Sequence, residues 1–439
     1  MSVIHAINRV SLERREYEET RPAAVRSDIS SVLDRPTAVT GELNELIKNL
    51  VETFHSNLDN LAMAVTEDTG KPISASRKEV AASLGVLLPY ANRSFEGWLD
   101  TGDDLKNQVP MRQGTSVVFP DAWCPLLSLT ERIVPGILSR KLTLISLNSR
   151  AFTAGKILLD EMDPDVALGC GLVTALFKNQ TSSLGVLKNE RVSDILFSGS
   201  VDGLSSLGIH GSYPSVRAEF GEGFSAIVTA DAKLDECAVS IAKLFLDYSR
   251  SPFRRPANVF VEGPIQEYLE NRLIEEISKH NAGDPFSEEI SVGFVSDPEV
   301  AGSIGSLLTS SKNRTLDLPF WNGFEKNVFY PALIREQPDS PALNGFGDLP
   351  LLKIRSISSI KNGFDSVARD GNLMFASIWS SDPYMEDMAR DSLHVSSVYF
   401  NAVPASLPAE WRNPLVNENV VQGPEALARS MLTRKTILH

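Results

Sequence analysis

Residues 217–238 read RAEFGEGFSAIVTADAKLDECA, and the short apolar run at their centre, SAIVTA (225–230), has the length and composition of a β-strand. Runs of the same kind recur on both sides of it, at TSVVF (115–119), LTLISL (142–147), SDILFSGS (193–200), NVFVEG (258–263) and FASIW (375–379). Helical stretches such as AFTAGKILLDEM lie between them. Strands that alternate with helices are typical of a parallel sheet, so the sequence predicts an α/β fold.

The chain before the first of these strands is helical in pattern. From Gly41 to Val65, apolar residues recur at three- and four-residue steps, which predicts one amphipathic helix. The segment TEDTGKP (66–72) should end it, because Gly70 can adopt the left-handed conformation and Pro72 cannot continue a helix. A second helix is predicted to run to about residue 98.

Composition excludes several classes of function. The chain has 439 residues and a formal net charge of −14, which disfavours binding to nucleic acid and to anionic membrane surfaces. No apolar run approaches the roughly 18 residues of a membrane span, and the charged N-terminus lacks an apolar leader core. The three cysteines and six histidines are too scattered for a disulfide framework or a metal site. We therefore expect a cytoplasmic protein without metal.

Four segments, taken in order, resemble the aldehyde dehydrogenase superfamily over about residues 35–439. TEDTGKP matches the family's E-x-G-K-P element. ILFSGS and RAEFGEGFSAIVTADAKLDECA follow its F-T-G-S and E-L-G-G-K-x-P-x-I-V-x-x-D-A-D-L-D-x-A. NVFVEG resembles the strand after the catalytic loop, and VQGPEALARSMLTRKTILH resembles the closing helix and strand.

The resemblance implies an aldehyde dehydrogenase-like α/β fold with three parts. A Rossmann-type, nucleotide-binding domain would span 1–220 and include an oligomerisation hairpin near 100–118. An α/β catalytic-type domain would span 221–405. Residues 406–439 would return to the first domain and end in an oligomerisation strand, RKTILH, which in this family adds to the sheet of a neighbouring subunit. A homodimer or a dimer of dimers is therefore expected.

The catalytic positions of the family are only partly kept. The family reaction needs a thiolate nucleophile, a carboxylate base and an amide donor for the oxyanion. Glu219 falls on the general-base position, although it could equally cap a turn or pair with an arginine. Phe253 stands at the nucleophilic cysteine, and Trp123 stands at the oxyanion asparagine. The neighbouring Cys124 shows neither a base nor a cause of a lowered pKa, which favours a plain buried cysteine.

The cofactor positions have changed as well. Leu147 replaces the lysine that holds the adenosine ribose in the family, and Asn344 replaces the glutamate that holds the second ribose. Gly199 and Ser200, in FSGSVDG, keep part of the phosphate-side turn. We expect no bound cofactor, or weak residual NAD(P) binding through these two residues.

These losses predict a pseudoenzyme that serves as a binding or scaffolding subunit, for which an active dehydrogenase is one partner to consider. A second hypothesis is a cofactor-free enzyme that uses Glu219 as its base. A third is an atypical NAD(P)-dependent aldehyde or acyl oxidoreductase. Arg250, Arg254 and Arg255, in SRSPFRRP (249–256), could bind a small anionic ligand in the old pocket or form ion pairs in a solvated loop.

Overall fold

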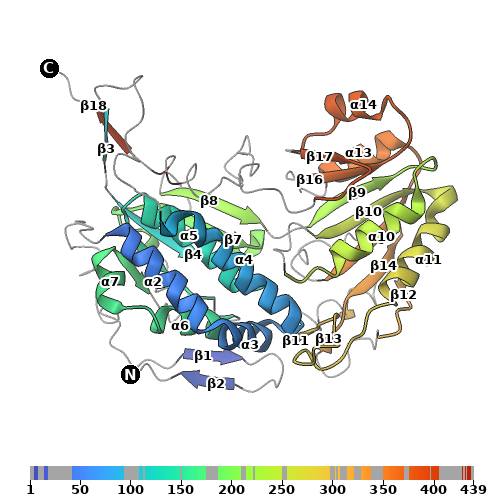
Figure 1. Ribbon diagram of the computed structural model, residues 1–439. Helices are drawn as coiled ribbons and strands as arrows, with labels where there is room; N and C mark the ends of the chain where they lie inside the picture. Colours follow the sequence, from blue (N-terminus) through green and yellow to red (C-terminus); the bar gives the residue numbers. More distant parts are fainter. Residues whose placement is uncertain are drawn as a thin grey trace.

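The chain folds into two halves, each built around one sheet (Figure 1). The computed structural model describes residues 4–7, 14–17, 42–92, 108–111, 114–148, 151–174, 186–208, 214–220, 223–249, 255–296, 302, 305–306, 314–320, 328–337, 350–369, 375–395, 397–404, 428, 431 and 433–436. The α/β class expected from the alternation of strands and helices is confirmed.

The first half contains a parallel five-stranded sheet in the order β6-β5-β4-β7-β8. Its strands are β4 (Thr115–Phe119), β5 (Leu142–Ile145), β6 (Leu172–Thr174), β7 (Val192–Gly199) and β8 (Ser215–Phe220). Alternate side chains point to opposite faces of a strand. Val118 and Leu196 therefore join the core under the helices of one face, whereas Val117 and Ile195 join a smaller core on the other.

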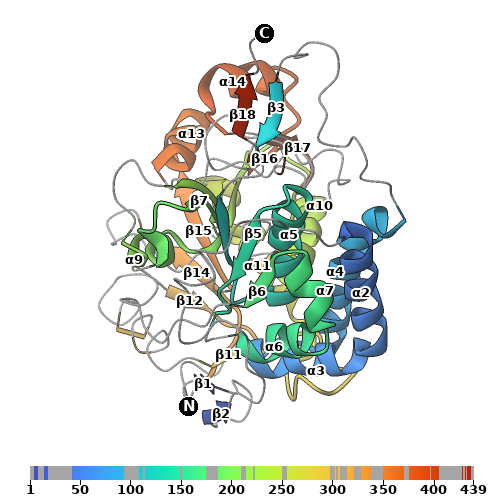
Figure 2. The same ribbon diagram turned by 90° about the vertical axis from the view of Figure 1, so that its left-hand side faces the viewer.

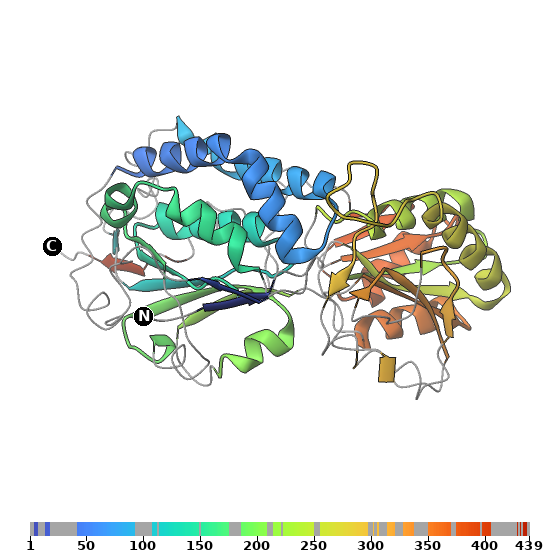
Figure 3. The ribbon, with the colours of Figure 1, turned by 90° about the horizontal axis from the view of Figure 1, so that it is seen from below.

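Two layers of helices cover one face of this sheet, as seen from below in Figure 3. The inner layer holds α5 (Pro125–Leu138), which packs on β4 and β5, and α6 (Phe152–Asp160). The outer layer is formed by α2 (Leu43–Ser56), α3 (Leu58–Thr69) and α4 (Ile73–Ala91). The short helices α7 (Pro164–Gly169) and α9 (Val201–Ser206) contact β6 and β7, respectively.

The single helix predicted from residue 41 to 69 is wrong in one respect, because it divides into α2 and α3. The break falls at Asn57, whose backbone leaves the helical region and whose side chain donates to the carbonyl of Thr53. An asparagine side chain competes in this way with the hydrogen bonds of a helix. The predicted end at Gly70 is confirmed, with φ of 76° and its N–H bonded to the carbonyl of Thr66.

The second half contains a seven-stranded sheet in the order β12-β14-β15-β10-β9-β16-β17, in which β12 alone runs antiparallel to its neighbour. Its strands are β9 (Phe224–Val228), β10 (Pro256–Glu262), β12 (Arg314–Leu316), β14 (Ala332–Glu336), β15 (Leu351–Ile357), β16 (Phe375–Trp379) and β17 (Ser397–Phe400). One face carries α10 (Leu234–Phe245) and α11 (Gln266–Ile277). The other carries α13 (Ile360–Arg369) and α14 (Met385–Ser392).

Three two-stranded pairs complete the described chain. β1 (Ile4–Ile7) pairs with β2 (Arg14–Tyr17), and β11 (Val295–Ser296) pairs with β13 (Val328–Phe329). The third pair joins β3 (Gln108–Met111) antiparallel to β18 (Thr433–Thr436) and projects beyond the five-stranded sheet (Figures 1 and 2). The region near 100–118 thus supplies one strand to this pair, while its last four residues belong to β4 in the central sheet. Within the described residues, no helix is long and apolar enough to cross a membrane.

Candidate functional site

The connection between β4 and α5 forms one wall of the candidate site. It leaves the carboxyl end of β4 and reaches α5 at Cys124, the N-cap residue, whose side chain makes no capping bond. Glu79 of α4 provides the cap instead, because its Oε1 accepts from the N–H of Leu126 at 2.9 Å and of Leu127 at 3.2 Å. A carboxylate is well placed at a helix N-terminus, where unpaired N–H groups and the helix dipole favour negative charge.

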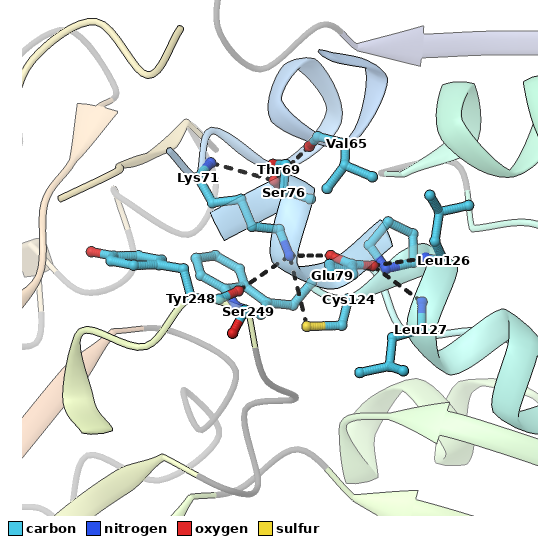
Figure 4. Close-up of polar contacts among 12 residues, drawn as sticks. Val65, Thr69, Lys71, Ser76, Glu79, Cys124, Leu126, Leu127, Tyr248 and Ser249 are labelled. Carbon is cyan, nitrogen blue, oxygen red and sulfur yellow. Dashed lines mark hydrogen bonds and ion pairs between the residues drawn. The ribbon is translucent and has the colours of Figure 1, made fainter. Parts of the chain in front are cut away.

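Lys71 lies at the centre of this arrangement and is completely buried (Figure 4). Its ammonium group forms an ion pair with Oε2 of Glu79 and donates to the carbonyl of Tyr248 at 3.3 Å. Its Nζ also lies 3.7 Å from Sγ of Cys124. Burial acts to lower the pKa of Lys71, but the surrounding acidic groups outweigh it and raise that pKa, so the side chain stays charged.

The turn that carries Lys71 also joins the two halves of the molecule. The carbonyl of Gly70 accepts from the N–H of Phe294, at 3.1 Å, and the N–H of Ile73 donates to the carbonyl of Pro285, at 2.8 Å. A Cβ on Gly70 would lie 2.2 Å from the carbonyl oxygen of Phe294, and its φ is positive. Glycine is therefore required here both by the backbone conformation and by the close approach of the other half.

Trp123 and Arg255, predicted from separate motifs, meet next to this turn. The guanidinium carbon of Arg255 lies 4.7 Å from the centre of the Trp123 ring. Tyr248 stacks on the same indole with a centroid distance of 5.8 Å and an interplanar angle of 30°. Only 5% of Trp123 and 3% of Arg255 is exposed. The indole N–H has no hydrogen-bond partner within the described part of the chain.

All three cysteines of the chain lie in described segments, and all three are buried. Burial raises the pKa of Cys124 well above its ordinary value, against the opposing effect of Lys71. Burial also raises the pKa of Cys170, to about 11, and that of Cys237. None of the three therefore presents the accessible thiolate that nucleophilic catalysis needs near neutral pH.

The predicted base and phosphate-side residues lie together at the carboxyl ends of two neighbouring strands. Glu219 is the penultimate residue of β8 and pairs in register with Ser198 of β7. Gly199 ends β7, and Ser200 is the N-cap of α9, where its hydroxyl accepts from the N–H of Gly203 at 3.0 Å. In α/β folds this edge of a parallel sheet is where ligands bind.

Several described side chains at this edge are engaged within the protein. Leu147 is apolar and packs against α6, with its Cδ2 2.6 Å from where a Cβ of Gly155 would lie. The buried Arg132 donates to the hydroxyl of Ser198 at 2.9 Å, and the hydroxyl of Ser200 is engaged as a cap.

Four predicted residues, Phe253, Arg250, Arg254 and Asn344, lie outside the described residues, so their predicted roles remain predictions. Over the segments that the structure describes, no group of three or more histidine, cysteine, aspartate or glutamate side chains could hold a metal ion.

The sequence analysis missed Lys71, Glu79 and Tyr248, which make the main contacts of the site. Lys71 lies in a polar, glycine-containing turn that reads as solvated, and a helix boundary separates it from Glu79. Tyr248 is 177 residues away from Lys71. One local signal is present in the sequence, because Lys71 belongs to TEDTGKP, the segment that matches a family element.

Comparisons with known proteins agree with this architecture. The chain matches the model of the aldehyde dehydrogenase family over residues 38–411. It is 23% identical to a lactaldehyde dehydrogenase of Methanococcus maripaludis strain C7 over 405 residues, covering 89% of this chain and 85% of the relative. It is also 23% identical to a sulfoacetaldehyde dehydrogenase of Neptuniibacter caesariensis, covering 79% of each chain. A structure of the glyceraldehyde-3-phosphate dehydrogenase GapN from Methanocaldococcus jannaschii, complexed with NADP, aligns with a TM-score of 0.78 at 17% identity, over 99% of this chain and 98% of that one, and shows the shared fold.

Proposed function

The chain belongs to the aldehyde dehydrogenase family, and from this premise we propose that it is a member without NAD-dependent aldehyde oxidation that acts as a binding or scaffolding subunit. The observation that carries the proposal is the state of its thiols. The family reaction begins with attack by a cysteine thiolate, and every cysteine of this chain is buried with a raised pKa. The stack of Arg255, Trp123 and Tyr248 adds to this, because it fills the region next to the lost oxyanion donor.

The proposal is tested by cofactor binding and turnover measured together. NAD and NADP are titrated into the purified protein by calorimetry, and lactaldehyde and sulfoacetaldehyde are assayed as substrates because relatives of this chain are named for them. Each missing charge-assisted hydrogen bond should weaken binding by about 1.5–3 kcal/mol, so we expect millimolar or weaker affinity and no turnover. The Methanococcus maripaludis relative serves as the active control. Micromolar binding with NADH production would instead establish the atypical oxidoreductase.

A second candidate function is supported by the buried Arg255. A guanidinium held over an indole in a buried site attracts anions, so the old pocket could bind a small carboxylate or phosphate for cofactor-free chemistry with Glu219 as base. Thermal stabilisation by such an anion in the native protein, lost in Arg255→Met, would favour this function over the scaffold. A stabilisation that Arg255→Met leaves unchanged would reject it.

We further propose that the protein assembles as a homodimer or a dimer of dimers in the cytoplasm. Within the described residues β3 and β18 form a sheet of two strands only, and such a ribbon is marginally stable in water without further partners. It projects from the body of the molecule, as an element meant for a neighbouring subunit would (Figure 1). Light scattering on the full chain, and on a chain lacking residues 432–439, tests this proposal. A full-length monomer at micromolar concentration would contradict it, and an active dehydrogenase that co-purifies would identify a mixed assembly.

A further inference from the structure

The contact between Lys71 and Cys124 suggests chemistry that the family reaction does not use. Nζ of Lys71 lies 3.7 Å from Sγ of Cys124, and both side chains are completely buried (Figure 4). The same ammonium group forms an ion pair with the carboxylate of Glu79. An amine, a thiol and a proton acceptor are thus held together inside the folded protein.

We propose that Lys71 and Cys124 are an oxidative modification site, in which a peroxide joins Nζ and Sγ through a covalent sulfenamide bond. In the first step, local opening of the packing admits water and hydrogen peroxide, and Cys124 loses its proton to water next to the ammonium group of Lys71. Hydrogen peroxide then oxidises the thiolate to a sulfenic acid and is itself reduced to water. Lys71 then gives one proton to Glu79, and its free amine attacks the sulfur. The S–O bond breaks as the S–N bond forms, the nitrogen loses a second proton, and the hydroxyl leaves as water. Two electrons pass from the thiol to the peroxide in total.

The surroundings favour the bond over the usual fates of a sulfenic acid. A disulfide needs a second thiol, but the group that contacts Sγ of Cys124 in the described structure is the amine of Lys71. Peroxide is small enough to enter through local opening of the packing, whereas a protein thiol is not. The sulfenic acid would therefore meet Lys71 before it meets another cysteine.

The modification would change the contact between the two halves of the molecule. It replaces a buried ammonium–carboxylate pair by a neutral bond and a protonated Glu79, which can still accept from the N–H groups of α5. The carbonyl of Tyr248 keeps a single, weaker donor in place of the ammonium group. Because Tyr248 also stacks on Trp123, peroxide would weaken this contact between the two halves.

The experiment is mass spectrometry of the full-length protein after treatment with hydrogen peroxide. The expected product is about 2 Da lighter than the reduced protein, because two hydrogens are lost, and dithiothreitol reverses the change. Digestion without reductant should give one peptide pair joined through Lys71 and Cys124. Labelling of the denatured protein should find one free thiol fewer, while Cys170 and Cys237 remain free.

Dimedone, which traps sulfenic acids, supplies the opposing outcome. Dimedone is added while the peroxide-treated protein is unfolded in urea, so that it reaches the buried sulfur. A dimedone adduct or a sulfinic acid on Cys124 of the native chain without the joined peptides would overturn the proposal, and so would an unchanged Cys124 thiol. Lys71→Arg keeps the positive charge without an amine nucleophile, so it should convert the bond into a dimedone adduct. If that variant fails to fold, Cys124→Ser keeps Lys71 paired with Glu79 and must show no loss of 2 Da. Cys237 is the matched control, because it is equally buried and burial alone raises its pKa.

Discussion

Two lysine–carboxylate pairs are buried at opposite ends of the five-stranded sheet, and their surroundings differ. Lys71 and Glu79 lie at the carboxyl end, against the N-terminus of α5 and the carbonyl of Tyr248. Lys141 and Asp194 lie at the amino end, where Nζ and Oδ2 are 2.5 Å apart. The first pair touches a thiol and a segment of the other half, whereas the second stays among the residues that begin the strands of one sheet.

The difference indicates what each pair does. Functional groups in α/β folds gather at the carboxyl ends of parallel strands, and the amino ends serve stability. Asp194 also accepts from the hydroxyl of Ser193, at 2.6 Å, and lies 3.7 Å from the partly exposed guanidinium of Arg217. The charge of Asp194 is therefore shared between two cations, whereas Glu79 forms its ion pair with Lys71. Loss of the lysine should therefore lower the unfolding free energy more in the Lys71–Glu79 pair than in the Lys141–Asp194 pair.

The largest effect is expected from Lys71→Met. This change leaves the carboxylate of Glu79 buried without its cation, which typically costs about 3–5 kcal/mol of unfolding free energy. Urea unfolding followed by circular dichroism measures it.

The matched control is the double variant Lys71→Met with Glu79→Gln. It removes the unpaired charge and keeps an oxygen to cap α5, so it should recover most of the loss. If the double variant is no more stable than Lys71→Met alone, the cost comes from lost packing or from the Tyr248 contact, and the electrostatic comparison fails.

A smaller change in the unfolding free energy is expected from the titration of Asp68, a buried carboxylate of α3. Its oxygens accept hydrogen bonds from the N–H of Ala154, at 3.0 Å, and from groups of Thr153. Burial raises its pKa from 3.8 to about 6. The folded protein thus binds this proton more tightly than the unfolded chain, so stability falls as the pH rises from about 4 to about 6 and stays lower above that. Two pKa units correspond to roughly 3 kcal/mol.

The variant Asp68→Asn isolates this contribution from the other carboxylates. At pH 7.5 it should be more stable than the native chain by up to roughly 3 kcal/mol, and at pH 4 the two should converge. Urea unfolding at both pH values provides the comparison. A difference that is the same at pH 4 and 7.5 would mean that Asp68 does not titrate between them.

Lys141→Met should cost less than Lys71→Met, roughly 1–3 kcal/mol, because Asp194 retains the hydroxyl of Ser193 and the guanidinium of Arg217. The same urea experiment ranks the two lysines directly. Equal losses would show that the second cation near Asp194 does not compensate, and that the two ends of the sheet are electrostatically alike.

Patterns local in the sequence were enough to predict the strands β4 and β16, the α/β class and the left-handed Gly70. These features depend on composition and periodicity within a few residues, which the sequence displays directly. The break between α2 and α3 at Asn57 was not predicted, because the apolar pattern continues through it. The contacts of Lys71 were not predicted, because the residues that make them come from three distant segments. No local pattern indicates that a lysine in a polar turn is buried.

The smallest expected effect tests how Ser200 is used at the carboxyl end of the sheet. Its hydroxyl caps α9, so Ser200→Ala should lower the unfolding free energy by about 1 kcal/mol, and Ser200→Gly by only a few tenths beyond any backbone effect. If the hydroxyl serves only as a cap, NAD(P) affinity measured by calorimetry should be the same in the native chain and in Ser200→Ala. A further loss of affinity in Ser200→Ala would show that this serine still contacts a nucleotide. The carboxyl end would then differ from the amino end by a retained binding function as well as by its contact with the other half.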